Sequence, residues 1–128
     1  MIISYLLLPR TSSLNEFRYN LPYTEMVGGA LAISRNQFVQ VNGFSNNFFG
    51  WGGEDDEFYE RLADHHLHPL RLPADQSHYV SLKHQKESPS SNRADHSTDP
   101  SQDGLNTLHY EVLGIRQLSM CTFLTVRL

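Results

Sequence analysis

One short stretch brings together residue types that can do chemistry. It reads Phe49-Gly50-Trp51-Gly52-Gly53-Glu54-Asp55-Asp56-Glu57, in which glycines surround the chain's one tryptophan and four acids follow in a row. A flat aromatic ring can stack on the apolar face of a sugar while carboxylates accept hydrogen bonds from its hydroxyls. Acids are also favoured in the first turn of a helix by its free N–H groups and dipole. Two interpretations stay open: a sugar or metal site, or an acidic helix start.

The elements around this stretch follow from apolar spacing. After the acids, Phe58 and Leu62 recur at helical spacing and predict a helix that ends near residues 65–66. Ser34 is a helix N-cap signal and Gly43 a C-cap signal, which predicts a second, short helix over residues 35–42. The small-residue apolar run over residues 27–34 suits a buried strand.

The remaining chain predicts further strands and one long polar tract. Residues 78–82, 108–112 and 119–126 have strand character. Residues 85–104 are polar and rich in Ser, Pro, Asn and Asp, which is typical of a functional lid or mobile segment, or of disorder without a role. Strands that alternate with helices indicate an α/β fold with a mixed sheet and flanking helices.

Composition narrows the function classes. The chain has 128 residues, of which 39% are hydrophobic, enough for the core of one small domain or part of a larger one. The net charge of −4 argues against nucleic acid as the main partner. The apolar start, residues 1–8, lacks the marks of a signal peptide and is far shorter than the roughly 20 residues of a membrane span.

Four segments together resemble the C-terminal part of the catalytic domain of the beta-1,4-galactosyltransferase family. They are Leu21-Pro22-Tyr23 followed by Gly28-Gly29, Asn42 to Asn46 running into Gly50-Trp51-Gly52-Gly53-Glu54-Asp55-Asp56, Leu82-Lys83-His84, and Asp103 to Tyr110. Their order and spacing match the family across residues 21–126. On this basis we divide the chain into an irregular N-terminal segment, residues 1–20, and a partial catalytic domain, residues 21–128.

The resemblance implies a fold and a reaction. The fold is the C-terminal half of a Rossmann-like, GT-A type nucleotide-sugar transferase domain. The reaction is inverting transfer of galactose, in beta-1,4 linkage, from UDP-galactose to a glycan acceptor, with Mn2+ holding the diphosphate. Terminal N-acetylglucosamine, xylose or glucose is the expected acceptor. A Golgi-lumen location is also implied, reached through a membrane anchor that this sequence does not contain.

The resemblance also assigns roles to residues. Asp55 is the general base on the acceptor hydroxyl, because inversion needs one carboxylate to receive that proton. Glu54 contacts the donor sugar or organises the site, and His84 binds the metal. The substrate-binding set consists of Trp51 on a mobile loop, Gly52, Gly53, Asp56, Tyr23, Met26 and Gly29. The Gly28-Gly29 pair lets a ligand lie against the backbone, unless it only forms a tight turn or bulge.

Some positions depart from the family. Ser81 stands where some members have a methionine metal ligand, and no D-x-D motif is present. Galactose-specific members tend to have a tyrosine where this chain has Met26, so UDP-N-acetylgalactosamine is a second candidate donor. We expect the chain to be a fragment that is inactive alone. The alternative is a non-catalytic sugar-binding or degenerate product of a truncated transferase gene.

Overall fold

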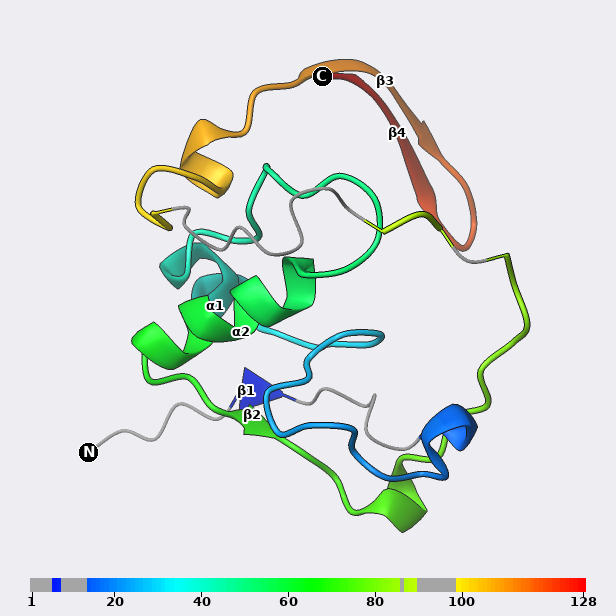
Figure 1. The fold of residues 1–128 in the computed structure, drawn as a ribbon. Helices are drawn as coiled ribbons and strands as arrows, with labels where there is room; N and C mark the ends of the chain where they lie inside the picture. Colours follow the sequence, from blue (N-terminus) through cyan, green and yellow to red (C-terminus); the bar gives the residue numbers. More distant parts are fainter. Residues whose placement is uncertain (1–5, 8–13, 86, 90–98) are drawn as a thin grey trace.

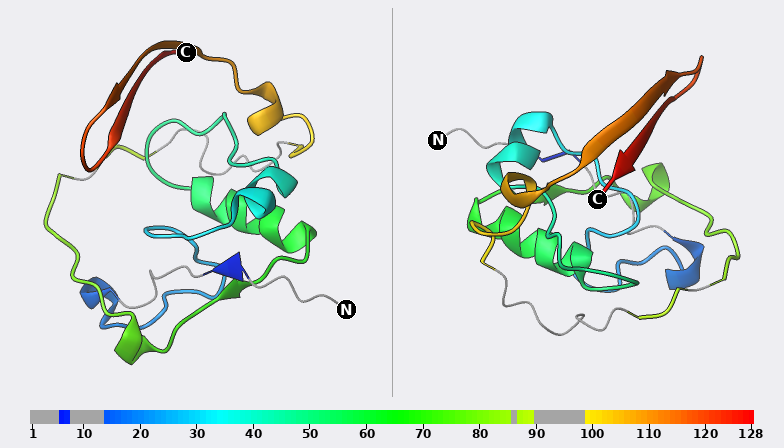
Figure 2. Two further views of the ribbon diagram at one scale, coloured as in Figure 1. Left: turned by 180° about the vertical axis from the view of Figure 1, so that it is seen from behind. Right: turned by 90° about the horizontal axis from the view of Figure 1, so that it is seen from above.

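The computed structural model describes residues 6–7, 14–85, 87–89 and 99–128. Two helices cross near the centre of the molecule, and a β-hairpin projects from one side (Figure 1, Figure 2). The elements in chain order are β1 (Leu6–Leu7), η2 (Asn15–Phe17), α1 (Arg35–Gln40), α2 (Glu54–Asp64), β2 (Pro69–Leu70), η3 (Ala74–Gln76), η4 (Leu105–Thr107), β3 (Glu111–Gln117) and β4 (Thr122–Arg127). No helix in this described part is long and apolar enough to cross a membrane.

Both predicted helices are present. Ser34 caps α1: its Oγ accepts from the N–H of Gln37, and the Gln37 side chain returns to the N–H of Ser34, which forms a capping box. Gly43 ends this helical segment with φ of 67° and donates its N–H to the carbonyl of Phe38, as the C-cap signal predicted. Helix α2 begins at the first acid, Glu54, and ends at Asp64.

The sheet is smaller than predicted. β1 and β2 pair in parallel, with Leu6 opposite Pro69, and β3 and β4 pair antiparallel, each as a separate two-stranded sheet. The strands predicted over 108–112 and 119–126 correspond to β3 and β4. Their side chains are exposed along both strands. The described residues therefore contain both helices and strands, as predicted for an α/β fold. Their strands do not form a mixed sheet flanked by helices.

Two predicted strands are wrong. Residues 27–34 contain a one-residue bridge at Leu31 and no strand, and Gly29, with φ of 85°, interrupts the extended run. Residues 78–82 also form no strand, and Tyr79 makes only an isolated bridge to Leu14. Among the described residues, no strand lies beside this run. It therefore pairs with another segment at one position only.

The core lies between the two helices and the chain that precedes them. Val27, Val41, Phe58, Leu62 and Leu67 are its buried hydrophobic residues. The ring of Phe44 stacks on that of Phe58, with centroids 4.0 Å apart, which fixes the loop after α1 against α2. This packing sets the direction of α2.

A buried arginine extends the core into a polar network. Arg61 is 1% exposed and pairs with Glu57 one turn earlier on α2. Its Nη1 donates to the carbonyl oxygens of Asp103, at 2.7 Å, and Gly43, at 3.2 Å. The Asp103 carboxylate in turn accepts the N–H of Asn46. One side chain thus joins α2 to two loops that are distant in sequence.

Gly104 lets the segment that follows Asp103 approach this network. Its φ is 147°, and a Cβ there would collide with the carbonyl oxygen of Asn42 and lie 2.9 Å from Nη1 of Arg61. The amide of Asn42 also exchanges hydrogen bonds with Asn106, at 2.7 and 3.0 Å. A side chain at position 104 would therefore separate two closely packed backbones.

We predict that Gly104→Ala destabilises the protein by about 2–4 kcal/mol, because both backbone strain and overpacking oppose it. The matched control is Gly114→Ala in β3, where an added Cβ meets nothing within 4 Å. That control should change the free energy of unfolding by less than about 1 kcal/mol. Urea unfolding followed by circular dichroism measures both. Equal effects of the two substitutions would contradict the close approach at Gly104.

Candidate functional site

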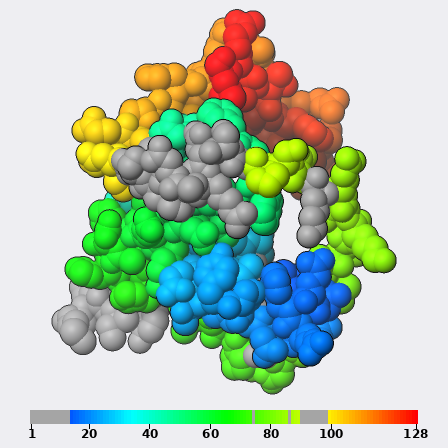
Figure 3. Space-filling model, viewed as in Figure 1, coloured from blue at the N-terminus to red at the C-terminus, as the bar shows by residue number. Residues whose placement is uncertain are grey.

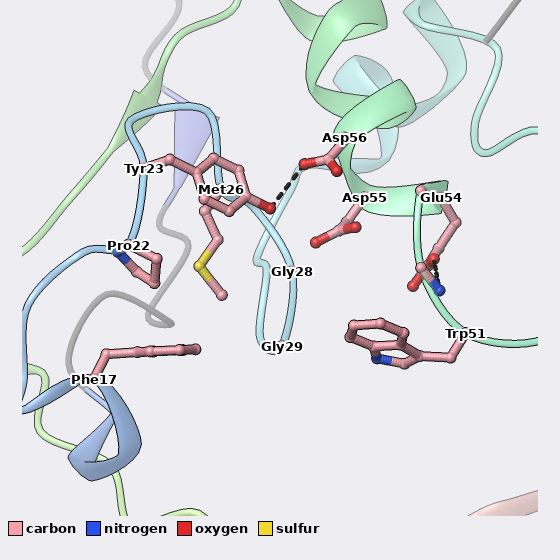
Figure 4. A pocket seen from close by; sticks show the side chains of 12 residues that line it. Phe17, Pro22, Tyr23, Met26, Gly28, Gly29, Trp51, Glu54, Asp55 and Asp56 are labelled. Carbon is pink, nitrogen blue, oxygen red and sulfur yellow. Dashed lines mark hydrogen bonds between the residues drawn. The ribbon is translucent and has the colours of Figure 1, made fainter. Parts of the chain in front are cut away.

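A pocket of about 350 Å³ opens beside the N-terminus of α2. Figure 4 shows Trp51 on one side, Phe17 and Met26 on the other, and the turn of Gly28 and Gly29 between them. The lining residues are Phe17, Pro22, Tyr23, Met26, Gly28, Gly29, Trp51, Gly52, Gly53, Glu54, Asp55 and Asp56. In Figure 3 the blue atoms of the N-terminal chain lie beside the green atoms of α2.

The pocket collects all the residues predicted to be catalytic or substrate-binding. Those residues come from two stretches far apart in sequence, 23–29 and 51–56. The predicted metal ligand, His84, is not part of the lining. The structure therefore brings the predicted site together in space, with the metal ligand apart, and the roles of its residues stay predictions.

The glycines before α2 shape the entry to the helix. Gly52 and Gly53 both have φ of 98°, in the left-handed region that residues with a Cβ rarely adopt. The Glu54 carboxylate folds back to accept the N–H of Gly52 at 3.1 Å. This bond explains the first acid in local terms: Glu54 holds the turn that leads from Trp51 into α2.

Asp56 and Tyr23 close one corner of the pocket. The hydroxyl of Tyr23 donates to Oδ1 of Asp56 at 2.8 Å, across 33 positions of sequence (Figure 4). This bond joins the loop before residue 27 to the first turn of α2. Asp56 thus has a structural contact within the pocket, and a ligand hydroxyl can compete for its carboxylate.

Asp55 lies between these two acids and carries the least favourable charge. Burial raises the pKa of its carboxyl, and the charges of Asp56 and Glu54 raise it further. Gly28 packs directly against it: a Cβ on Gly28 would collide with Oδ2 of Asp55. A carboxylate with a raised pKa is a stronger base than an ordinary aspartate, so Asp55 is the residue of this site best suited to accept a proton.

The fourth acid of the run does something else. Glu57 is 2% exposed and pairs with Arg61 in the core, away from the pocket. Burial, together with the charges of Asp103 and Glu60, raises the pKa of its carboxyl although Arg61 acts to lower it. The acidic run is therefore divided: three acids line the pocket, and one belongs to the buried network.

The aromatic walls include one residue that sequence reasoning missed. Phe17 follows a turn-rich stretch, in a short 3-10 helix, and no periodic pattern marked it. Trp51 is 54% exposed, and its loop is held by a hydrogen bond from its N–H to the carbonyl oxygen of Ser88 at 3.1 Å. Two aromatic faces across a pocket with carboxylates at its base suit the apolar and hydroxyl faces of a sugar.

The described residues do not make a metal site. His84 is exposed and its Nδ1 lies 3.0 Å from the carbonyl oxygen of Leu82, which leaves Nε2 as the ring nitrogen for a ligand bond. No group of three or more His, Cys, Asp or Glu residues within this part of the chain is placed to hold an ion. One imidazole does not fit the ligand number that Mn2+ requires.

Comparison with known proteins identifies the class as glycosyltransferases. A family model described as the N-terminal domain of galactosyltransferase matches residues 8–85. The chain is 36% identical to bovine beta-1,4-galactosyltransferase 1 over 121 residues, which cover 89% of this chain and 30% of that protein. It is also 36% identical to human beta-1,4-galactosyltransferase 3 over 109 residues, 79% of this chain and 28% of that protein. The chain belongs to the beta-1,4-galactosyltransferase family.

Solved structures agree with this assignment. The catalytic domain of Drosophila beta-1,4-galactosyltransferase 7, in complex with xylobiose, superposes with a TM-score of 0.62 at 28% identity. A mutant of that enzyme, in complex with manganese, UDP-Gal and xylobiose, gives a TM-score of 0.60 at 26% identity. Both matches cover 81% of this chain and 50% of the solved chain. The chain thus spans about a third of the curated relatives and half of the solved domains.

We predict that Asp55→Asn stabilises the fold at pH 7. Because the folded-state pKa of Asp55 lies above the ordinary value of 3.8, the folded state loses stability as pH rises from that value through the raised pKa. Removing the charge removes this penalty and should raise the unfolding temperature at pH 7 above that of the wild type. The difference should disappear below the ordinary pKa, where Asp55 is protonated in both states.

Thermal unfolding at pH 7 and pH 3, followed by circular dichroism, measures this effect. Asp64→Asn is the control, since Asp64 is an exposed acid at the end of the same helix. If Asp55→Asn unfolds at the wild-type temperature at pH 7, the charge of Asp55 does not destabilise the folded state.

Proposed function

We propose that this chain forms the acceptor and catalytic part of an inverting glycosyltransferase that uses a UDP-sugar to make a beta-1,4 linkage. The observation that carries the proposal is the position of Asp55, whose pKa is raised and which faces a pocket with aromatic walls. Family membership supports the reaction class, and the xylobiose and UDP-Gal bound to the solved relatives support the ligand classes.

The reaction assigns one task to each wall of the pocket. Trp51 stacks on the acceptor sugar, and Asp56 and Tyr23 hold its hydroxyls. The acceptor oxygen attacks the anomeric carbon of the donor sugar, the bond from that carbon to the diphosphate breaks, and UDP leaves with the electron pair. Asp55 takes the proton of the attacking hydroxyl, so that inversion at the anomeric carbon is complete in one step.

The steps above use the side chains of the chain alone, and Mn2+ takes part in none of them. When bound, Mn2+ neutralises charge on the leaving diphosphate. The resemblance assigns His84 to it as a ligand, and one imidazole does not hold the ion by itself. The expected Golgi-lumen location and membrane anchor likewise rest on the resemblance to the family.

We predict that Asp55→Asn lowers sugar transfer at least about 100-fold while sugar binding stays within a few fold of wild type. Because the chain is expected to be inactive alone, transfer from UDP-galactose to xylobiose, with Mn2+, is measured by product mass after joining it to the upstream half of bovine beta-1,4-galactosyltransferase 1. Binding is measured by the fluorescence of Trp51, the one tryptophan of the chain. Asp64→Asn is again the control and should leave both readouts unchanged.

The outcome separates two classes of protein. If the wild type transfers the sugar and Asp55→Asn abolishes this transfer, the result supports the proposed enzyme activity. Xylobiose binding without transfer, both by the wild type alone and by the wild type joined to the upstream half of bovine beta-1,4-galactosyltransferase 1, supports the alternative, a non-catalytic sugar-binding product. Absence of both binding and transfer overturns the proposed function for this chain.

We further propose that Met26 admits an N-acetyl group on the donor sugar. Its flexible side chain lines the pocket beside Tyr23 and opposite Trp51 (Figure 4). Met26→Tyr should lower the ratio of N-acetylgalactosamine to galactose transfer about tenfold, because a rigid ring fills the space. Met26→Leu is the size-matched control and should keep the ratio. Competition between the two UDP-sugars measures it, and an unchanged ratio in Met26→Tyr would refute the idea.

A further inference from the structure

Arg71 holds the loop that forms one wall of the pocket, although it does not line the pocket itself. It directly follows β2 in the chain. Its Nη2 donates two short hydrogen bonds, to the carbonyl oxygen of Thr24 at 2.8 Å and to that of Met26 at 2.7 Å. A guanidinium that bridges two carbonyls fixes both the position and the orientation of the peptide units between them.

The loop that Arg71 holds has little regular structure of its own. No helix or strand lies between residues 18 and 34. The backbone bond within the turn, from the N–H of Met26 to the carbonyl of Tyr23, is long at 3.4 Å. This turn carries two pocket residues, Tyr23 and Met26. Its shape therefore depends on contacts from outside, and Arg71 supplies two of them.

The position of Arg71 is unfavourable for a residue that only stabilises the fold. Burial lowers the pKa of its guanidinium, which shows that its charge is partly removed from water. Its Nη1 is buried without a hydrogen-bond partner among the described residues. The charges of Tyr59 and Glu25 favour the guanidinium and offset part of this cost, and the two hydrogen bonds to the turn are the direct contacts that a charged group makes here.

We propose that Arg71 is a positioning residue that fixes the Tyr23–Met26 wall and thereby sets the affinity of the pocket for sugar. The inference rests on the proposed function for its ligand, and the contacts of Arg71 with Thr24 and Met26 carry it independently. Arg71 acts through these backbone carbonyls: when they are released, the hydroxyl of Tyr23 moves relative to Asp56 and the pocket loses its shape.

The first experiment needs no ligand. Hydrogen exchange followed by mass spectrometry compares wild type, Arg71→Gln and Arg71→Lys. Arg71→Gln should speed exchange at least about tenfold in peptides from residues 22–30 and leave the core of α2 unchanged. Arg71→Lys keeps the charge and one donor direction, so its effect should be intermediate. Arg127→Gln is the matched control, because Arg127 is exposed and pairs with Glu111 on the far hairpin.

The second experiment measures xylobiose affinity by Trp51 fluorescence. Arg71→Gln should weaken binding roughly 10- to 100-fold, while Arg127→Gln binds as wild type. Combining Arg71→Gln with Tyr23→Phe should weaken binding by less than the product of the two single effects, since both changes act on one wall. A residue that only stabilised the fold would show independent effects and faster exchange throughout.

The two experiments fail separately. If the wild type binds no xylobiose, the proposed function falls and the exchange data still decide the role of Arg71. If exchange over residues 22–30 is the same in wild type and Arg71→Gln, Arg71 does not position this wall. If exchange changes but affinity does not, the wall is not part of the sugar site, and the proposal is likewise overturned.

Discussion

The buried ion pair of Arg61 and Glu57 is the constraint on which the rest of this structure depends. Both side chains are almost fully removed from water, and the guanidinium also binds the backbone and carboxylate of Asp103. Losing one partner would leave a buried charge, which is among the costliest changes a core can suffer. The network thus ties α2 to two loops, around Gly43 and Asp103, that also bind each other.

The register of α2 follows from this tie. Glu57 and Arg61 are four residues apart and share the face that points to the core. With this face fixed, the 3.6-residue period turns Asp55 and Asp56 away from the core and toward the pocket, which Glu54 reaches from the end of the helix. The helix thereby presents Asp55 to the site while Glu57 of the same acidic run stays in the core. A structural ion pair and a candidate catalytic base thus share one run of acids.

The sequence correctly predicted the helix ends, which depend on residues that are close together in the chain. The cap at Ser34, the terminating Gly43 and the acidic start of α2 appear where expected, because caps and helix periodicity act over a few residues. The strands predicted at 27–34 and 78–82 did not form, because a strand needs a partner that no local pattern supplies. Most of the residues that line the pocket had been named through the Trp51 motif and its resemblance to a family, and their roles stay predictions.

The long-range contacts could not be predicted from the sequence for the same reason, because no local pattern specifies a distant partner. Nothing in the run of residues that contains Phe17 indicates that it lines a pocket. The pairing of Arg61 with Asp103 spans 42 positions, and neither residue belongs to a pattern that names the other. The polar tract over residues 85–104 lies partly outside the described residues, so its predicted role as a lid stays a prediction. Resemblance to a family locates motifs, whereas their supporting contacts require coordinates.

The three acids that line the pocket differ in how the structure compensates their charges. Glu54 is compensated by the N–H of Gly52, and Asp56 by the hydroxyl of Tyr23. Asp55 accepts hydrogen bonds from backbone N–H groups of the first turn, but burial and its two charged neighbours outweigh them. Gly28 packs against this carboxylate and keeps it partly buried. The arrangement concentrates the electrostatic cost on Asp55, and proton uptake there relieves that cost.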